Sequence, residues 1–109
     1  MTRCEFSLGE DDRISGFSVS GHSGYAEAGS DILCASIRAA VTVAACTITD
    51  VCGVRAKVRD DETKPRTSLT LPATYEYEEA VQAVLAGLLN YLMALRDEFP
   101  DYIEVVMEV

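Results

Sequence analysis

The chain has 109 residues, of which 49% are hydrophobic and 25% are charged, and its formal net charge is −9. This length suits one compact domain over residues 1–109 and leaves little room for a second. The excess of carboxylates argues against nucleic acid as a direct partner, because phosphate contacts need clustered Lys and Arg. An acidic surface instead suits a cationic peptide or protein, or serves solubility alone.

Residues 1–12 mix charged and apolar side chains and do not resemble a signal peptide. The most apolar window, residues 39–49, is far shorter than a membrane span. The cysteines lack a Cys-x-x-Cys pair and accompany a single histidine, which argues against a zinc site. We therefore expect a cytoplasmic protein without membrane contact, metal or cofactor, whose thiols are free: Cys4, Cys34, Cys46 and Cys52.

Two short strands are predicted at the start of the chain. Residues 3–8 alternate between apolar and polar side chains, and a second strand over 14–20 follows the turn at 9–12. Gly16 interrupts the alternation, which suggests a bulge or a close backbone approach. The resulting hairpin leads into a glycine-rich loop.

A long helix is predicted from Asp31 to Cys52, ended by Gly53, which suits the left-handed residue that follows a helix. Apolar residues recur at helical spacing from Leu33 to Val51, and many positions between them are alanine or cysteine. A helix that is apolar on most sides is expected to be buried on most sides.

The second half repeats this order of elements. A third strand over 54–59 carries one cationic face, interpreted as solvated, and a turn at 60–65 leads to a fourth strand over 67–71. An amphipathic helix from Thr74 or Tyr75 to Phe99 and a strand over 102–107 follow. The order ββαββαβ predicts a two-layer α+β domain, with two long helices on a mostly antiparallel mixed sheet.

The loop before the first helix carries the residues most suited to chemistry. Cys34 falls in the first helical turn, where unpaired N–H groups and the macrodipole favour the negative charge of a thiolate. His22, the only histidine, is close enough in sequence to reach it at little loop-closure cost. The pattern alone leaves a packing cysteine and a structural histidine as alternatives.

Asp31 has two possible roles. As the helix N-cap, its carboxylate would accept from the N–H of Cys34 and reduce that group's availability to an oxyanion. If Ser30 is the cap instead, Asp31 could orient His22. We favour capping or bracing of the loop, because a carboxylate beside a thiolate would raise the pKa of the thiol. The amides around Gly29 and Ser30 are then the candidate oxyanion donors.

The same loop resembles the signature of the ribosomal-processing cysteine proteases in four pieces: Gly21-His22, Gly29-Ser30-Asp31, Ile32-Leu33 and Cys34-Ala35. The resemblance implies an endopeptidase with Cys34 as nucleophile and His22 as general acid/base. It also implies a homodimer, and a substrate that is the N-terminal extension of a large-subunit ribosomal protein, cut after aromatic residues and before a small one.

One position departs from that resemblance, because Arg38 stands where the family has a serine one helical turn after the cysteine. Arg38 could steady the thiolate, bind substrate carbonyls, or be solvated. Ser23, Tyr25 and Glu27 are candidates to line a substrate cleft, or are polar for solvation alone.

Two other functions fit the same residues. One is a non-catalytic, ribosome-associated module that holds a basic peptide. The other is a different thiol hydrolase, such as a small amidohydrolase or acyltransferase, that uses the same Cys and His on another substrate.

Overall fold

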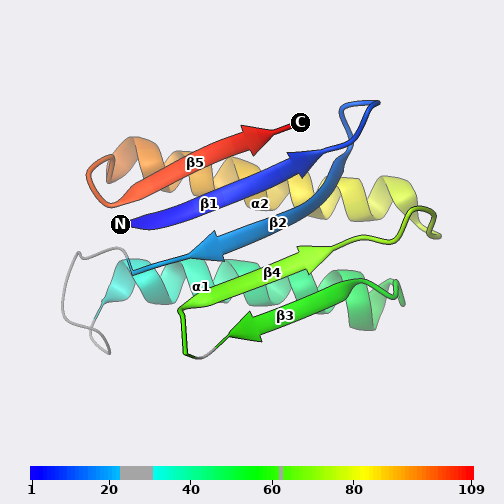
Figure 1. The fold of residues 1–109 in the computed structure, drawn as a ribbon, viewed down its shortest axis with the longest axis horizontal. Coiled ribbons are helices and arrows are strands. Elements are labelled where there is room, and N and C mark those ends of the chain that lie inside the picture. Colours follow the sequence, from blue (N-terminus) through cyan, green and yellow to red (C-terminus); the bar gives the residue numbers. More distant parts are fainter. Residues whose placement is uncertain (23–30, 62) are drawn as a thin grey trace.

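The computed structural model describes residues 1–22, 31–61 and 63–109, and its elements follow the predicted order ββαββαβ (Figure 1). A π-helical turn, Thr47–Val51, continues the first helix. The strands are β1 (Thr2–Leu8), β2 (Ile14–Ser20), β3 (Lys57–Asp61), β4 (Arg66–Thr70) and β5 (Ile103–Glu108), and the helices are α1 (Ile32–Cys46) and α2 (Glu78–Glu98).

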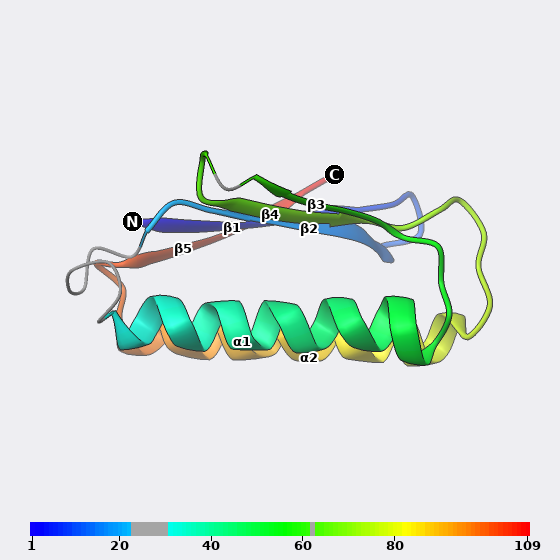
Figure 2. The same ribbon diagram turned by 90° about the horizontal axis from the view of Figure 1, so that it is seen from below.

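The five strands form one mixed sheet in the order β3-β4-β2-β1-β5. Its neighbours are antiparallel except β1 and β5, which pair in parallel. Both helices lie on one face of the sheet, and no described helix covers the other face (Figure 2). The predicted two-layer α+β fold is confirmed.

The core lies between the sheet and the helices. Each fully buried large apolar side chain stabilises such a core by roughly 1.5–3 kcal/mol. The strands contribute Phe6 and Phe17, whose ring centroids are 6.0 Å apart. The helices each contribute one stripe, namely Leu33, Ile37, Val41 and Ala44 from α1, and Val81, Leu85, Leu88 and Leu92 from α2.

The outer face of the first helix is apolar yet uncovered. Ile32, Val43 and Val51 are 75%, 65% and 78% exposed, so the prediction of burial on most sides is wrong. By length and composition, Ile32–Val51 could cross a membrane, a test that core helices of soluble proteins and signal sequences also pass. The apolar stretch is therefore longer than the window 39–49 that the sequence analysis considered. In the fold, one stripe of the helix packs against the sheet.

Gly16 has both of its predicted roles. The register of β1 and β2 shifts beside it, and a Cβ atom at this position would lie 2.4 Å from the Leu69 carbonyl oxygen. No other residue permits β4 to approach β2 this closely.

The third strand begins later than predicted. The N–H of Ala56 donates to the carbonyl of Val54 at 2.9 Å, which closes a three-residue turn before the strand. The strand β3 then runs on to Asp61, through residues assigned to the turn. The alternation over 54–59 is therefore only partly that of a strand.

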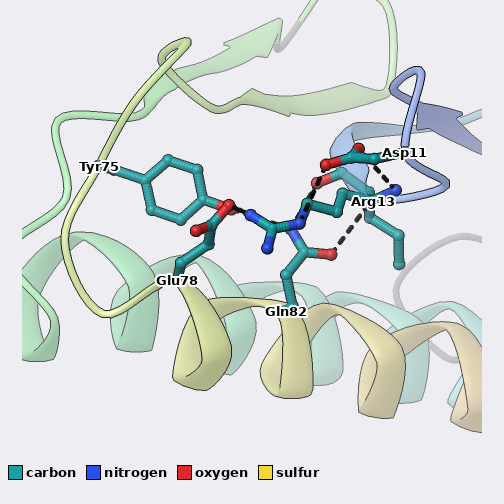
Figure 3. A network of polar contacts seen from close by, with 6 residues as sticks. Asp11, Arg13, Tyr75, Glu78 and Gln82 are labelled. Carbon is teal, nitrogen blue, oxygen red and sulfur yellow. Dashed lines mark hydrogen bonds and ion pairs between the residues drawn. The ribbon is translucent and has the colours of Figure 1, made fainter.

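The second helix also begins later than predicted, at Glu78, because Tyr77 adopts a left-handed conformation with φ of 59°. A polar network anchors this end (Figure 3). The Gln82 amide accepts the N–H of Ile14 at 2.9 Å and donates to its carbonyl at 2.8 Å and to the Tyr75 hydroxyl at 2.9 Å. Arg13 pairs with Glu78 beside it. These contacts fasten the start of β2 to α2.

Candidate active site

Cys34 is held at the mouth of α1 by a side-chain cap. Asp31 has extended backbone angles, and its carboxylate Oδ1 accepts the N–H of Cys34 at 3.0 Å. Its carbonyl accepts the N–H of Ala35 at 3.1 Å, which starts the helical hydrogen bonds. Asp31 is buried and the Cys34 side chain is half-buried. The capping role favoured from the sequence is the one that the structure shows.

His22 follows a glycine, Gly21, that comes directly after β2. Gly21 has a φ of 85°, and a Cβ atom there would lie 2.5 Å from the Met1 carbonyl oxygen. Its N–H donates to the Pro65 carbonyl at 2.8 Å. The adjacent His22 side chain is exposed. The end of β2 and the start of α1 lie at the same end of the molecule (Figure 1). His22 comes two residues after β2 and Cys34 lies in the first turn of α1, so both belong to that end.

Arg38 lies one helical turn beyond Cys34 and is exposed. The remaining predicted site residues lie outside the described residues, so their roles stay predictions: Ser23, Tyr25, Glu27, Gly29 and Ser30. The sequence interpretation overlooked the N–H groups of Ile32 and Leu33, which precede the first intrahelical bond. The assignment of Asp31 as N-cap was the signal that could have identified them.

The four cysteines differ in environment. Cys4 is buried in the core, and burial raises its pKa to about 12, so this thiol is inert at neutral pH. Cys46 is exposed, while Cys34 and Cys52 are half-buried. Within the described ranges, no group of three or more His, Cys, Asp or Glu side chains is arranged to hold a metal ion.

A thiol at a capped helix N-terminus and an imidazole at the same end of the domain are the residue types that a cysteine-dependent hydrolase uses as nucleophile and base. The family model described as cysteine protease Prp matches residues 1–104. The chain therefore belongs to the cysteine protease Prp family, and it is a cysteine peptidase.

Solved structures share the whole fold. The essential ribosomal processing protease Prp from Staphylococcus aureus, with a covalently linked product peptide, has a TM-score of 0.89 at 19% identity. The structure of the same protease with a substrate peptide has a TM-score of 0.85 at 18% identity. Each alignment covers 99% of this chain and 100% of the other. A protein from Streptococcus mutans has a TM-score of 0.83 at 17% identity, and the alignment covers 99% of this chain and 97% of that protein. No match was found among curated protein sequences.

The cap provides the first prediction. Asp31→Ala is expected to lower the free energy of unfolding by about 1 kcal/mol, because an N–H at the helix start loses its acceptor. Asp31→Asn should keep most of the stability, since asparagine also caps helices. Urea denaturation measures both values. A stable Asp31→Asn variant without peptidase activity would contradict a purely capping role and favour orientation of His22.

Alkylation provides the second prediction. If exposure alone decided the rate of alkylation, Cys46 would react first. If Cys34 is an activated thiolate, it should react first near neutral pH. Cys4 should stay unmodified in either case, because it is buried. Peptide mass spectrometry after brief iodoacetamide treatment gives the order of labelling. His22→Ala should slow labelling of Cys34 and leave Cys46 unchanged as an internal control. Labelling of Cys46 ahead of Cys34 would refute activation.

Proposed function

We propose that this cysteine peptidase removes the N-terminal extension of a large-subunit ribosomal protein in the cytoplasm. The observation that carries the proposal is the capped Cys34 at the same end of a Prp-family fold as His22. The Staphylococcus aureus relatives are named ribosomal processing proteases and were solved with peptides bound. A net charge of −9 also suits a basic substrate.

In the proposed reaction, the Cys34 thiolate attacks the carbonyl carbon of the last residue of the extension. The peptide bond breaks as the protonated His22 imidazole gives its proton to the departing amine, the new N-terminus of the ribosomal protein. The extension stays on Sγ as a thioester. Water activated by His22 then hydrolyses the thioester and restores the thiol.

The cap limits which N–H groups can stabilise the oxyanion. The N–H of Cys34 already donates to Asp31, so it is a poor candidate. The N–H groups of Ile32 and Leu33 come earlier in the same turn and are the candidate donors among the described residues. Loop amides around Gly29 and Ser30 remain candidates from the sequence.

The cytoplasmic location is supported by the cysteines, all four of which are free thiols. Disulfides are rare in reducing compartments such as the cytoplasm, so four free thiols are consistent with that location. Family membership favours peptide-bond cleavage over a non-catalytic module or another thiol hydrolase.

The third prediction tests the cleavage. Wild-type protein incubated with the extended ribosomal-protein precursor of the source organism should release the extension, as intact-mass analysis will show. Cys34→Ala should release none, and His22→Ala should be slower by roughly 10²- to 10⁴-fold. Cys46→Ala is the matched control and should retain full activity. No release by the wild type, with tight precursor binding, would support the non-catalytic module instead.

We also propose a homodimer formed through the outer faces of the helices. A hollow of about 560 Å³ lies between α1 and α2, lined by residues that include Ala39, Ala40, Val43, Gly87 and Tyr91. Val43 and Tyr91 are 65% and 41% exposed, an apolar area suited to burial against another chain.

Gly87 supports close approach of a partner. Glycine inside a helix costs about 1 kcal/mol relative to alanine. A Cβ atom at Gly87 would meet nothing within 4 Å, so packing within the described residues does not require a glycine there. A helix from a second copy seated in the hollow would account for it.

The fourth prediction separates this face from exposed apolar surface in general. Val43→Glu should convert the dimer to monomer, because the buried carboxylate would lack a partner. Val51→Glu is the matched control, since Val51 is equally apolar and 78% exposed but does not line the hollow. Light scattering after size-exclusion chromatography gives the masses. A monomeric wild type, or two variants with the same mass, would contradict the proposed interface.

A further inference from the structure

Arg38 is a charged residue without a partner among the described residues. It is the only charged residue in α1, is exposed, and makes no hydrogen bond or ion pair with any described residue. Three other arginines are paired: Arg3 with Glu104 at 3.1 Å, Arg13 with Asp11 at 3.1 Å and Arg96 with Asp97 at 3.2 Å. A cation in the N-terminal half of a helix gains nothing from the macrodipole.

Helical geometry places Arg38 beside Cys34. Four residues along an α-helix give a separation of about 6 Å along the axis and about 40° around it, so both side chains lie on one flank. The hollow between the helices is lined by the opposite flank of α1, which includes Ser36, Ala40 and Val43. The flank with Cys34 and Arg38 therefore faces away from α2.

Carboxylates on the same helical segment leave Arg38 available. Asp31 is engaged with the N–H of Cys34. Asp50, near the other end of the segment, is about 18 Å further along the axis from Arg38 at 1.5 Å per residue. A guanidinium binds a carboxylate through two parallel N–H bonds, the strongest charge-assisted geometry open to it.

We infer that Arg38 is a specificity-determining residue that binds a carboxylate side chain of the substrate, two or three residues from the scissile bond. An extended peptide advances about 3.3 Å per residue, so 6 Å corresponds to about two residues, and the length of the arginine side chain extends this to three. The inference rests on the proposed role of Cys34 as nucleophile.

The test uses synthetic peptides with an aromatic residue before the scissile bond and a small residue after it. Matched peptides carry Glu, Gln or Lys at the second or third position on either side. Wild-type protein should cleave the best Glu peptide with a kcat/KM about tenfold above that of its Gln counterpart. Arg38→Gln should abolish this preference, and Arg38→Glu should transfer it to the Lys peptide. The wild-type preference should shrink in 1 M salt.

Arg55→Gln is the matched control, because Arg55 is also exposed, has no ion pair among the described residues and lies outside α1. It should keep the wild-type preference. Equal cleavage of Glu and Gln peptides by wild type would overturn the inference. So would an Arg38→Gln variant that slows all peptides equally, because that result assigns Arg38 to the thiolate or the oxyanion.

Failure of the inference is distinguishable from failure of the proposed function. A wild type that prefers Glu peptides but leaves the ribosomal precursor intact would refute the ribosomal substrate and support the role of Arg38. If no peptide is cleaved, fluorescence anisotropy of labelled Glu and Gln peptides with Cys34→Ala gives their affinities. Equal affinities would then overturn the inference, and an Arg38-dependent preference for Glu would support it.

Discussion

The hydrogen bond from the N–H of Cys34 to the carboxylate of Asp31, at 3.0 Å, is the constraint on which the site depends. It sets the residue at which α1 begins, and it therefore places the thiol of Cys34 in the first turn of the helix. The buried stripe that starts at Leu33 fixes the rotation of the helix against the sheet. Cap and stripe together direct Cys34 and Arg38 to one flank, which leaves the opposite flank to the hollow beside α2.

Much of the fold could be predicted from periodicity. The second strand was predicted with its observed bounds, and Gly16 was correctly associated with a bulge and a close approach. The errors lie where local backbone geometry overrides the pattern. The turn from Val54 to Ala56 lies in a stretch that alternates like a strand but is not yet one. The left-handed Tyr77 delays the start of α2, although Glu76 before it is a good helix former. The Gln82 bonds to Ile14 join residues 68 apart, which no local pattern reveals.

The part of the site that could be predicted from the sequence is the part fixed by the spacing of residues along the chain. A capping residue three positions before a cysteine identifies the helix start, and the structure confirms that role for Asp31. Gly21, which precedes His22, lies so close to the Met1 carbonyl oxygen that a Cβ atom would not fit, and this contact between residues 20 apart in the sequence cannot be predicted from a local pattern. The isolation of Arg38 likewise depends on what surrounds α1 in three dimensions. The exposed outer face of α1 was misjudged because a small-residue, apolar sequence looks the same whether one side or all sides are buried.

The most direct test of the central claim is to trap the thioester on Cys34. A junction peptide mixed with wild-type protein and quenched in acid during turnover should add the mass of the acyl half of the peptide to the protein, and fragmentation should place it on Cys34. His22→Ala should lower the amount of adduct formed early in the reaction. Cleavage that proceeds with Cys34 unmodified, or with the adduct on Cys46 or Cys52, would contradict the account.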